Sequence, residues 1–540
     1  MERNVVLFLV LSVAIIIGYS VLVPPVPLAP LVKTEGPAPM SVPPATPPPD
    51  VPGGKTPPRD PGPEREVTVE TDLYRATIST RGAVITSWRL SRYTNGAQNR
   101  TPIDLFVPQT EGATVFPLTV VVDTTDEALK TAFERGPFAL EGGDLRLSPL
   151  NPTGVLHLTA RGPHGEELSK HLTFHHDSYQ VDLQVTARRT SAEARVVLGE
   201  NFGIRSWGDM TMVGYVGPVT LVDGEPVQDK PSKLDRPAVH AGRVGWTALQ
   251  DKYFVAALIP SAAQAVAVAE RFGEHRVTAG LRLASGGQPT AMRLYAGPKE
   301  YDRLVAMKIG LDETIDFGWF IYGSWSIVRL IAEPLFLILK FLHAYTGNYG
   351  VAIILLTALI KTVFIPLTHK SYISMRAMAA LQPQMQSIQK KYKHDKVRLN
   401  QELMGLYKSN KVNPLGGCLP MILQIPFFVA FFNILYTTIE LRQAPFILWI
   451  TDLAEKDPSY VLPVLMGATM VLQQKLQPTT MDPMQAKLML FLPIVFTFFF
   501  LTFPSGLVLY WMVNNLLSIL QQVLTKKYWK PQPLVIPKGL

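Results

Sequence analysis

The stretch from Gly350 to Leu367 reads GVAIILLTALIKTVFIPL and contains one charged residue, Lys361. As a helix it is about 27 Å long, close to the ~30 Å hydrocarbon core of a bilayer. This stretch belongs to an apolar segment, Tyr349–Leu367, and four more apolar segments follow it: Leu415–Tyr436, Tyr460–Gln474, Leu488–Phe503 and Ser505–Leu524. Tyr460–Gln474 is short for a membrane span, which leaves a re-entrant segment as the alternative there. The five segments predict a C-terminal five-helix transmembrane bundle.

The composition of the whole chain agrees with a membrane protein. Of 540 residues, 47% are hydrophobic and 17% are charged, against about 25% charged in a typical soluble domain. These figures exclude a wholly soluble enzyme and a disordered chain. The net charge of +8 favours an acidic partner, such as anionic lipid, RNA or an acidic peptide. With one cysteine, Cys418, and no carboxylate-rich cluster around its histidines, the chain is expected to bind no metal.

The N-terminal part predicts an anchor followed by a spacer. Residues Val5–Val23 carry no charge, and prolines rather than a small-residue cleavage site follow them, so we expect an uncleaved transmembrane anchor at 1–23 instead of a signal peptide. The Pro-rich segment 24–66 is expected to be an extended linker. Gly54-Lys55-Thr56 resembles the end of a phosphate-binding loop, but Pro49 stands where its first glycine belongs. No nucleotide site is therefore predicted.

Residues 67–310 predict a large all-β domain. The runs Tyr179–Val185, Val155–Leu158 and Thr114–Val122 alternate polar and apolar side chains, and Gly-rich turns separate such runs. Alternation with a period of two is typical of half-buried strands. About 240 residues of short strands favour one large β-sandwich.

The charges of the loops predict the orientation of the spans. Segment 369–413 carries nine Lys/Arg and two acids, whereas the loop 437–459 carries two basic and four acidic residues. By the positive-inside rule, 369–413 and the tail 531–540 are cytoplasmic and 437–459 is outside. Counting six spans places the β domain outside and the N-terminus inside.

Two amphipathic regions accompany the predicted core at 346–530. Segment 325–345 is apolar with interspersed charges and an interrupting proline, Pro334, and is expected to lie along the outer interface. Segment 369–413 predicts a helical hairpin with a Met-rich apolar face. Its basic residues are candidates for contact with ribosomal RNA or anionic lipid: Lys390, Lys391, Lys393, Lys396 and Arg398.

Lys361 is the outstanding intramembrane residue. A charge at the centre of a membrane helix costs about 2.5–3.5 kcal/mol and normally faces a bundle interior or water. Thr357 lies on the same helical face, four residues earlier, Gln424 adds a polar group in the next span, and Asn514 and Asn515 add two in the last. These residues predict either a wet, positively charged cavity open to the cytoplasm or interhelical hydrogen bonds that hold the bundle together.

Several motifs in the second half resemble one family. They are Gly347-Asn-Tyr-Gly350, Val412-Asn-Pro-Leu-Gly-Gly-Cys-Leu-Pro420, Glu440-Leu-Arg-Gln-Ala-Pro-Phe446, Pro478-Thr-Thr480 with Asp482-Pro483-Met484, and Phe503-Pro-Ser-Gly-Leu507. With them, the chain resembles the bacterial YidC-type membrane protein insertases, which have mitochondrial and chloroplast relatives. The resemblance implies a periplasmic β-supersandwich and a five-helix core in the bacterial inner membrane. It implies no enzyme activity, cofactor, nucleotide or covalent chemistry.

The resemblance also implies a hydrophilic groove and a route for substrates. The groove charge of the family is typically arginine, and Lys361 stands in that position. Thr357, Gln424, Tyr510 and Trp511 match groove-lining positions, and Ile425, Phe428 and Met489 are expected to line a slide along the third and fifth spans. The implied partners are nascent membrane proteins, the Sec translocon and the ribosome. The alternative function is that of a structural adaptor that docks the translocon without inserting anything.

Overall fold

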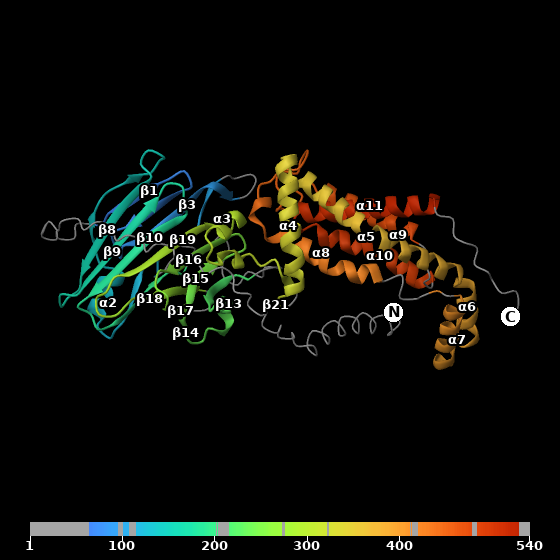
Figure 1. Cartoon of the computed structure of the whole chain (residues 1–540), viewed down its shortest axis with the longest axis horizontal. Coiled ribbons are helices and arrows are strands. Elements are labelled where there is room, and N and C mark those ends of the chain that lie inside the picture. The colour runs from blue at the N-terminus through green and yellow to red at the C-terminus, as the bar shows by residue number, and fades with distance from the viewer. Residues whose placement is uncertain are drawn as a thin grey trace, which may run out of the picture. The chain divides into compact units, whose positions relative to one another are not determined.

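The computed structural model describes residues 64–95, 101–106, 115–200, 202, 215–272, 276–320, 323–410, 412, 419–477 and 483–528. The predicted anchor 1–23, nearly all of the linker 24–66 and the tail 531–540 lie outside the described residues. Within them, a strand-rich region precedes a helical region (Figure 1).

The strand-rich region contains three large sheets. In spatial order, the strands of the first sheet are β4 (Thr101–Asp104), β3 (Val84–Asn95), β2 (Tyr74–Ser79), β1 (Glu66–Glu70) and β7 (Leu145–Arg146). Those of the second are β13 (Glu225–Gln228), β12 (Gly217–Val222), β15 (Val244–Gln250), β16 (Phe254–Pro260), β19 (Thr290–Pro298), β10 (Gln180–Arg188), β9 (Glu167–His175), β8 (Thr153–Arg161) and β6 (Ala139–Glu141). Those of the third are β14 (Ala238–Gly242), β17 (Ala265–Phe272), β18 (Arg276–Arg282), β11 (Glu193–Val197) and β5 (Val120–Asp123).

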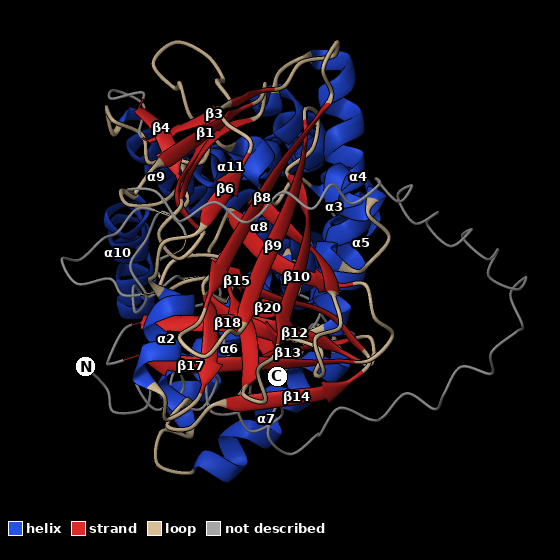
Figure 2. Cartoon of the chain, turned by 90° about the vertical axis from the view of Figure 1, so that its left-hand side faces the viewer, coloured by secondary structure: helices blue, strands red, loops and turns tan. Residues whose placement is uncertain are grey.

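Alternating side chains explain the centre of the second sheet. Along β8, β9 and β10, every second residue is buried, as expected when one face of a strand packs on a core. These strands are antiparallel neighbours and run side by side in Figure 2. The strand predicted at Thr114–Val122 is shorter, because β5 begins only at Val120. Pro117 has no N–H to donate to a ladder, and Leu118 adopts a positive φ of 70°.

One lysine connects all three sheets. Lys170 occupies an inward position of β9 and is fully buried. Its ammonium group donates hydrogen bonds to the carbonyl oxygens of Gly82 (2.7 Å) and Ala83 (3.0 Å), between β2 and β3, and of Leu118 (2.7 Å), just before β5. Burial lowers the pKa of Lys170 to about 7. The hydrogen bonds of this side chain therefore hold the three sheets together within the core.

The helices lie mainly in the second half of the chain. They are α2 (Glu127–Glu134), α3 (Tyr301–Ala306), α4 (Ser326–Thr346), α5 (Tyr349–Ala380), α6 (Gln382–Lys391), α7 (Lys396–Ser409), α8 (Leu419–Thr437), α9 (Val461–Leu476), α10 (Pro483–Phe500) and α11 (Ser505–Tyr528). The short elements are the 3₁₀ turns η1 (Pro231–Lys233), η2 (Leu311–Thr314) and η4 (Ile439–Leu441), and the pair β20 (Trp319–Phe320) and β21 (Gly323–Ser324). Among the described residues, α5 and Ser505–Lys527 of α11 are long and apolar enough to cross a membrane, and shorter apolar helices cover Gln424–Thr437, Val461–Leu476 and Phe491–Phe500.

Two helices run further than the sequence predicts. α4 continues through Pro334, so the expected interruption there is wrong. On either side of this proline, α4 buries Ala332 and Phe336 in the core. α5 does not end at Leu367 but continues through Pro366 to Ala380. A proline inside a helix removes one backbone hydrogen bond without necessarily ending the helix.

Polar contacts join the loop after α8 to the strand-rich domain. The carboxylate of Glu440 accepts a hydrogen bond from the amide of Tyr301 (3.2 Å), and Arg442 and Gln443 donate to the carbonyl oxygen of Thr94 (2.9 Å each). Burial raises the pKa of Glu440 to about 7. These contacts hold the loop after α8 against the β domain.

Candidate functional site

Lys361 lies in α5 and faces α11. Its ammonium group donates a hydrogen bond to the hydroxyl of Ser518 (2.8 Å), and that hydroxyl donates to the carbonyl oxygen of Asn514 (2.7 Å). Ser518 is buried, whereas Lys361 is half-buried. An ammonium group has three N–H donors, and one of them is used by the hydrogen bond to Ser518. The charge is thus held in place without being enclosed.

Further side-chain hydrogen bonds connect the apolar helices. Gln424 of α8 donates to Asn514 (3.4 Å), Asn515 of α11 donates to Thr469 of α9 (3.1 Å), and Gln521 of α11 donates to Thr368 of α5 (2.6 Å). We call this set, together with Lys361 and Ser518, the polar track. It connects α5, α8, α9 and α11 through polar groups, which are costly in an apolar environment unless they are paired or hydrated.

The other predicted groove residues do not all join the polar track. Thr357 is buried, and its hydroxyl donates to the carbonyl oxygen of Ile353 in its own helix (2.6 Å). Tyr510 and Trp511 pack in an aromatic cluster instead. The ring of Phe428 lies 5.0 Å from that of Trp511, and Phe431 lies 4.6 Å from Tyr510, between ring centroids. The cluster forms an apolar wall between α8 and α11.

The predicted slide residues lie on α8 and α10. Ile425 exposes 43% of its surface, and Phe428 is half-buried. Met489 belongs to α10, but its side chain lies outside the described residues. Further along α10, Phe498 and Phe499 are 69% and 54% exposed. These two helices therefore present apolar side chains outward, as expected for a surface that faces lipid or an apolar substrate.

The basic hairpin residues point into solvent. Lys390, Lys391, Lys393 and Arg398 are exposed, and Lys396 lies outside the residues whose side chains are described. The hairpin has its own small core, in which Leu381, Met385 and Val412 are buried. Met378, Leu403 and Tyr407 pack against this core, so this part of the Met-rich apolar face serves the internal packing of the hairpin.

Sequence reasoning missed four residues of the polar track, Thr368, Thr469, Gln521 and Ser518, and of these Ser518 is the one that contacts Lys361. It lies 157 positions from Lys361, so no local pattern connects the two. A signal does exist within α11, because Tyr510, Asn514 and Ser518 recur every four residues and share one face of the helix.

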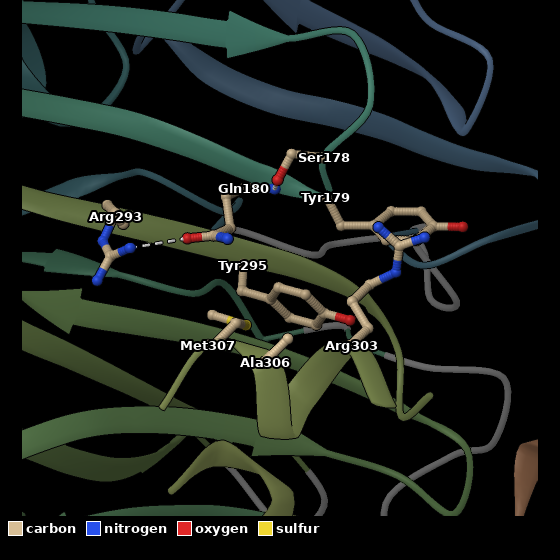
Figure 3. A pocket seen from close by; sticks show the side chains of 8 residues that line it. All are labelled: Ser178, Tyr179, Gln180, Arg293, Tyr295, Arg303, Ala306 and Met307. Carbon is tan, nitrogen blue, oxygen red and sulfur yellow. Dashed lines mark hydrogen bonds between the residues drawn. The ribbon is translucent and has the colours of Figure 1, made fainter. Parts of the chain in front are cut away.

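A separate hollow lies in the β domain, where the sequence could not place a cleft. It has a volume of about 350 Å³ and is lined by residues of β10, β19 and α3. In Figure 3, Tyr295 lies between Arg293 and Arg303. Arg293 donates to the amide oxygen of Gln180 (3.0 Å), and Arg303 pairs with Glu300 (3.0 Å). Neither the hollow nor any other group of described residues gathers three or more His, Cys, Asp or Glu side chains as a metal site requires.

A strand-rich domain is followed by apolar helices that share a largely half-buried polar track, an architecture that suits an inner membrane protein with a periplasmic domain. Residues 66–338 match the family model of the YidC periplasmic domain, and residues 341–532 match that of the 60Kd inner membrane protein. The chain belongs to the YidC family of membrane protein insertases.

The sequences of individual relatives match this chain over nearly its whole length. The membrane protein insertase YidC of Geotalea uraniireducens (strain Rf4) is 39% identical over 554 residues, which cover 98% of this chain and 99% of the relative. The YidC insertase of Geotalea daltonii is 37% identical, with 98% of this chain and 99% of the relative covered. A crystal structure of an active YidC insertase, with its first transmembrane domain resolved, matches 86% of this chain and 92% of its own at 17% identity and a TM-score of 0.36.

The family decides between the two functions left open by the sequence. Its members are membrane protein insertases and not enzymes, so this chain is an insertase of the inner membrane rather than an adaptor without activity. An insertase acts on nascent membrane proteins, which are the substrates that its polar and apolar surfaces have to accommodate.

Proposed function

We propose that the polar track is the lining of a hydrophilic groove that receives the polar N-terminal tail of a nascent membrane protein. The observation that carries this proposal is Lys361, a half-buried ammonium group with one hydroxyl acceptor in the midst of apolar helices. Transfer of a polar group into hydrocarbon is costly unless hydrogen bonds replace its hydration. Lys361, Gln424 and Asn514 offer such hydrogen bonds to a tail, and the positive charge favours acidic tails.

The apolar segment of the substrate takes a different route. We infer that it leaves sideways along α8 and α10, past Ile425, Phe428 and Met489, into the bilayer. Exposed apolar side chains on both helices support this route. Thr357, Tyr510 and Trp511 act as supports of the groove wall, since their side chains are engaged in packing or in a hydrogen bond within α5.

The arrangement in the membrane completes the proposal. The segment 1–23 is the anchor, 24–66 the linker and 67–310 a periplasmic supersandwich. Segment 325–345 lies at the interface, and 346–530 forms the five-helix core. The hairpin 369–413, the tail 531–540 and the N-terminus are cytoplasmic. The Sec translocon is a further partner. Anionic lipid or the ribosome binds to the basic side chains of the hairpin, which are Lys390, Lys391, Lys393, Lys396 and Arg398.

Charge variants at position 361 test the proposal. Purified protein is reconstituted into vesicles, and the insertion of single-span substrates with acidic or neutral N-terminal tails is measured by protease protection. We expect Lys361→Glu to lower insertion of the acidic-tail substrate about tenfold, the effect of ~1.4 kcal/mol, and Lys361→Arg to retain it. Lys475→Glu, a charge reversal at an exposed position in the last turn of α9, is the matched control. Equal insertion by the Glu and Arg variants would remove Lys361 from the mechanism.

A further inference from the structure

A second polar cavity lies at the outer ends of α8 and α10. Its volume is about 300 Å³, and it is lined by Tyr436 near the end of α8, by Thr502 between α10 and α11, and by Asn95 and Lys252 of the β domain. We call it the exit pocket. The cavity thus lies between the end of α8, the segment that follows α10 and the periplasmic domain.

The charges of the exit pocket favour an anion. Three basic residues line it, Lys252, Arg442 and Lys456, against the acidic residues Asp251 and Glu455. One carboxylate oxygen of Asp251 already accepts hydrogen bonds from the amides of Tyr253 (2.7 Å) and Phe254 (2.6 Å). These hydrogen bonds hold that carboxylate in its own turn without removing its charge, so three positive and two negative side chains line the pocket, a net charge of +1.

Two of the cations are positioned by their surroundings. The ammonium group of Lys252 lies 3.5 Å from the ring centroid of Tyr436, an arrangement that holds a cation over an aromatic face. Arg442 donates from Nη2 to the carbonyl oxygen of Thr94 (2.9 Å), and its Nε is buried with no hydrogen-bond partner among the described residues. Lys456 is exposed. The pocket is preorganised in part before any ligand arrives.

An aromatic ladder leads to this pocket from the level of the polar track. On α8, Phe428, Phe432 and Tyr436 recur every four residues, with ring centroids 6.3 Å and 5.7 Å apart. The ring of Phe428 contacts Trp511 of α11, and the ring of Tyr436 lies under the ammonium group of Lys252. One aromatic face of α8 therefore connects the aromatic cluster with the exit pocket.

We propose that the exit pocket binds the carboxylates of an acidic substrate tail after the tail has crossed the membrane. The inference rests on the proposed function and adds a second binding site for the substrate tail. Basic flanks are retained on the cytoplasmic side, so the tails that cross are those poor in basic residues, and a cationic pocket at the outer surface favours the arrival of acidic ones. The pocket lies between polar residues of the β domain and the ends of both slide helices, which fits an emerging peptide.

The experiment combines charge removal with crosslinking. The double variant Lys252→Gln/Lys456→Gln is reconstituted into vesicles, and insertion is measured with acidic-tail and neutral-tail substrates. We expect the acidic-tail substrate to insert about two- to fivefold more slowly, the size of one solvent-accessible ion pair, and the neutral-tail substrate to be unaffected. The double Arg variant, which keeps the charges, should restore the rate. Arg293→Gln, in the hollow of the β domain, should have no effect. A photocrosslinker at Thr502 should capture the acidic tail.

The outcomes separate this inference from the proposed function. One outcome would overturn the proposal for the exit pocket: the double Gln variant inserts both substrates like the unmodified protein, and the crosslinker at Thr502 captures no tail. This holds even if Lys361→Glu abolishes insertion. If Lys361→Glu has no effect but the double Gln variant does, the proposed groove fails and the exit pocket stands. Capture of lipid alone at Thr502, with equal slowing of both substrates, would assign the pocket to a phospholipid headgroup and overturn the proposal. Thermal unfolding of each variant shows whether it is folded.

Discussion

Lys170 and Lys361 are both lysines withdrawn from bulk water, yet they differ in every contact. Lys170 is fully buried and gives its three N–H donors to three backbone carbonyl groups. Lys361 is half-buried and donates to one hydroxyl. A cation whose donors are all used by the protein stabilises the fold and has nothing left for a ligand. A cation with one partner keeps donors and charge for something that arrives later. The contacts of Lys170 make it a structural lysine, whereas those of Lys361 agree with the role that we propose for it in receiving a substrate tail.

The largest effect expected from this comparison is on stability. Lys170→Met leaves three buried carbonyl groups without their donor, and each unsatisfied buried group costs about 1–3 kcal/mol. We expect the free energy of unfolding to fall by about 3 kcal/mol or more, and that of Lys361→Met to change by less than about 1 kcal/mol. Thermal unfolding of the full-length protein in detergent measures both. A drop of similar size in the two variants would break the distinction.

A smaller effect concerns pH. The pKa of Lys170 is lowered to about 7 in the fold, whereas an unfolded chain has the ordinary lysine value of about 10.4. Between these values the unfolded state binds the extra proton, whereas the folded side chain is a neutral amine with two N–H donors for its three carbonyl neighbours. The cost of burying the charge is therefore relieved as pH rises from about 7 to about 10.4 and returns as pH falls back. The difference in melting temperature between unmodified protein and Lys170→Met should therefore grow between pH 7 and pH 9. A constant difference across that range would contradict the assignment.

The smallest effect is expected at the partner of Lys361. Ser518→Ala removes the one hydrogen-bond acceptor that Lys361 has among the described residues, but the ammonium group can then turn to water. We expect a loss of stability below about 1 kcal/mol and insertion of an acidic-tail substrate within about twofold of the unmodified protein. The vesicle assay and thermal unfolding measure the two quantities. A loss as large as that of Lys170→Met would make Lys361 structural as well.

The two lysines also show how far a sequence can be interpreted. Lys361 stands out because it is the one charge in an apolar stretch, and that signal is local. Lys170 carries a local signal too, since it occupies the inward position between Leu168 and Leu172 in an alternating strand. The partners of both are not local. Gly82, Leu118 and Ser518 lie far from them in the chain, and only the packing of sheets and helices brings them together.

The same difference between local patterns and distant contacts applies to the fold. Alternation predicts β8 and β10, and apolar runs predict the long helices, because each pattern reflects which face of one element is buried. The sequence does not give the order of nine strands in a sheet, since that depends on pairings between distant residues. The shortened β5 and the uninterrupted α4 depend on single prolines, Pro117 and Pro334, whose effect is set by the neighbours that satisfy the freed backbone groups.

The length of α5 has a mechanical consequence. At 1.5 Å per residue its 32 residues extend about 48 Å, well beyond a ~30 Å hydrocarbon layer. The outer end is fastened where Asn348 donates to the carbonyl oxygen of Phe446 (2.8 Å), and the backbone is weakest at Pro366 because a hydrogen bond is missing there. Lys361 lies on the fastened side of that joint, and the hairpin lies on the other. A bend of α5 at Pro366 would move the hairpin while leaving Lys361 at a constant distance from the fastened end.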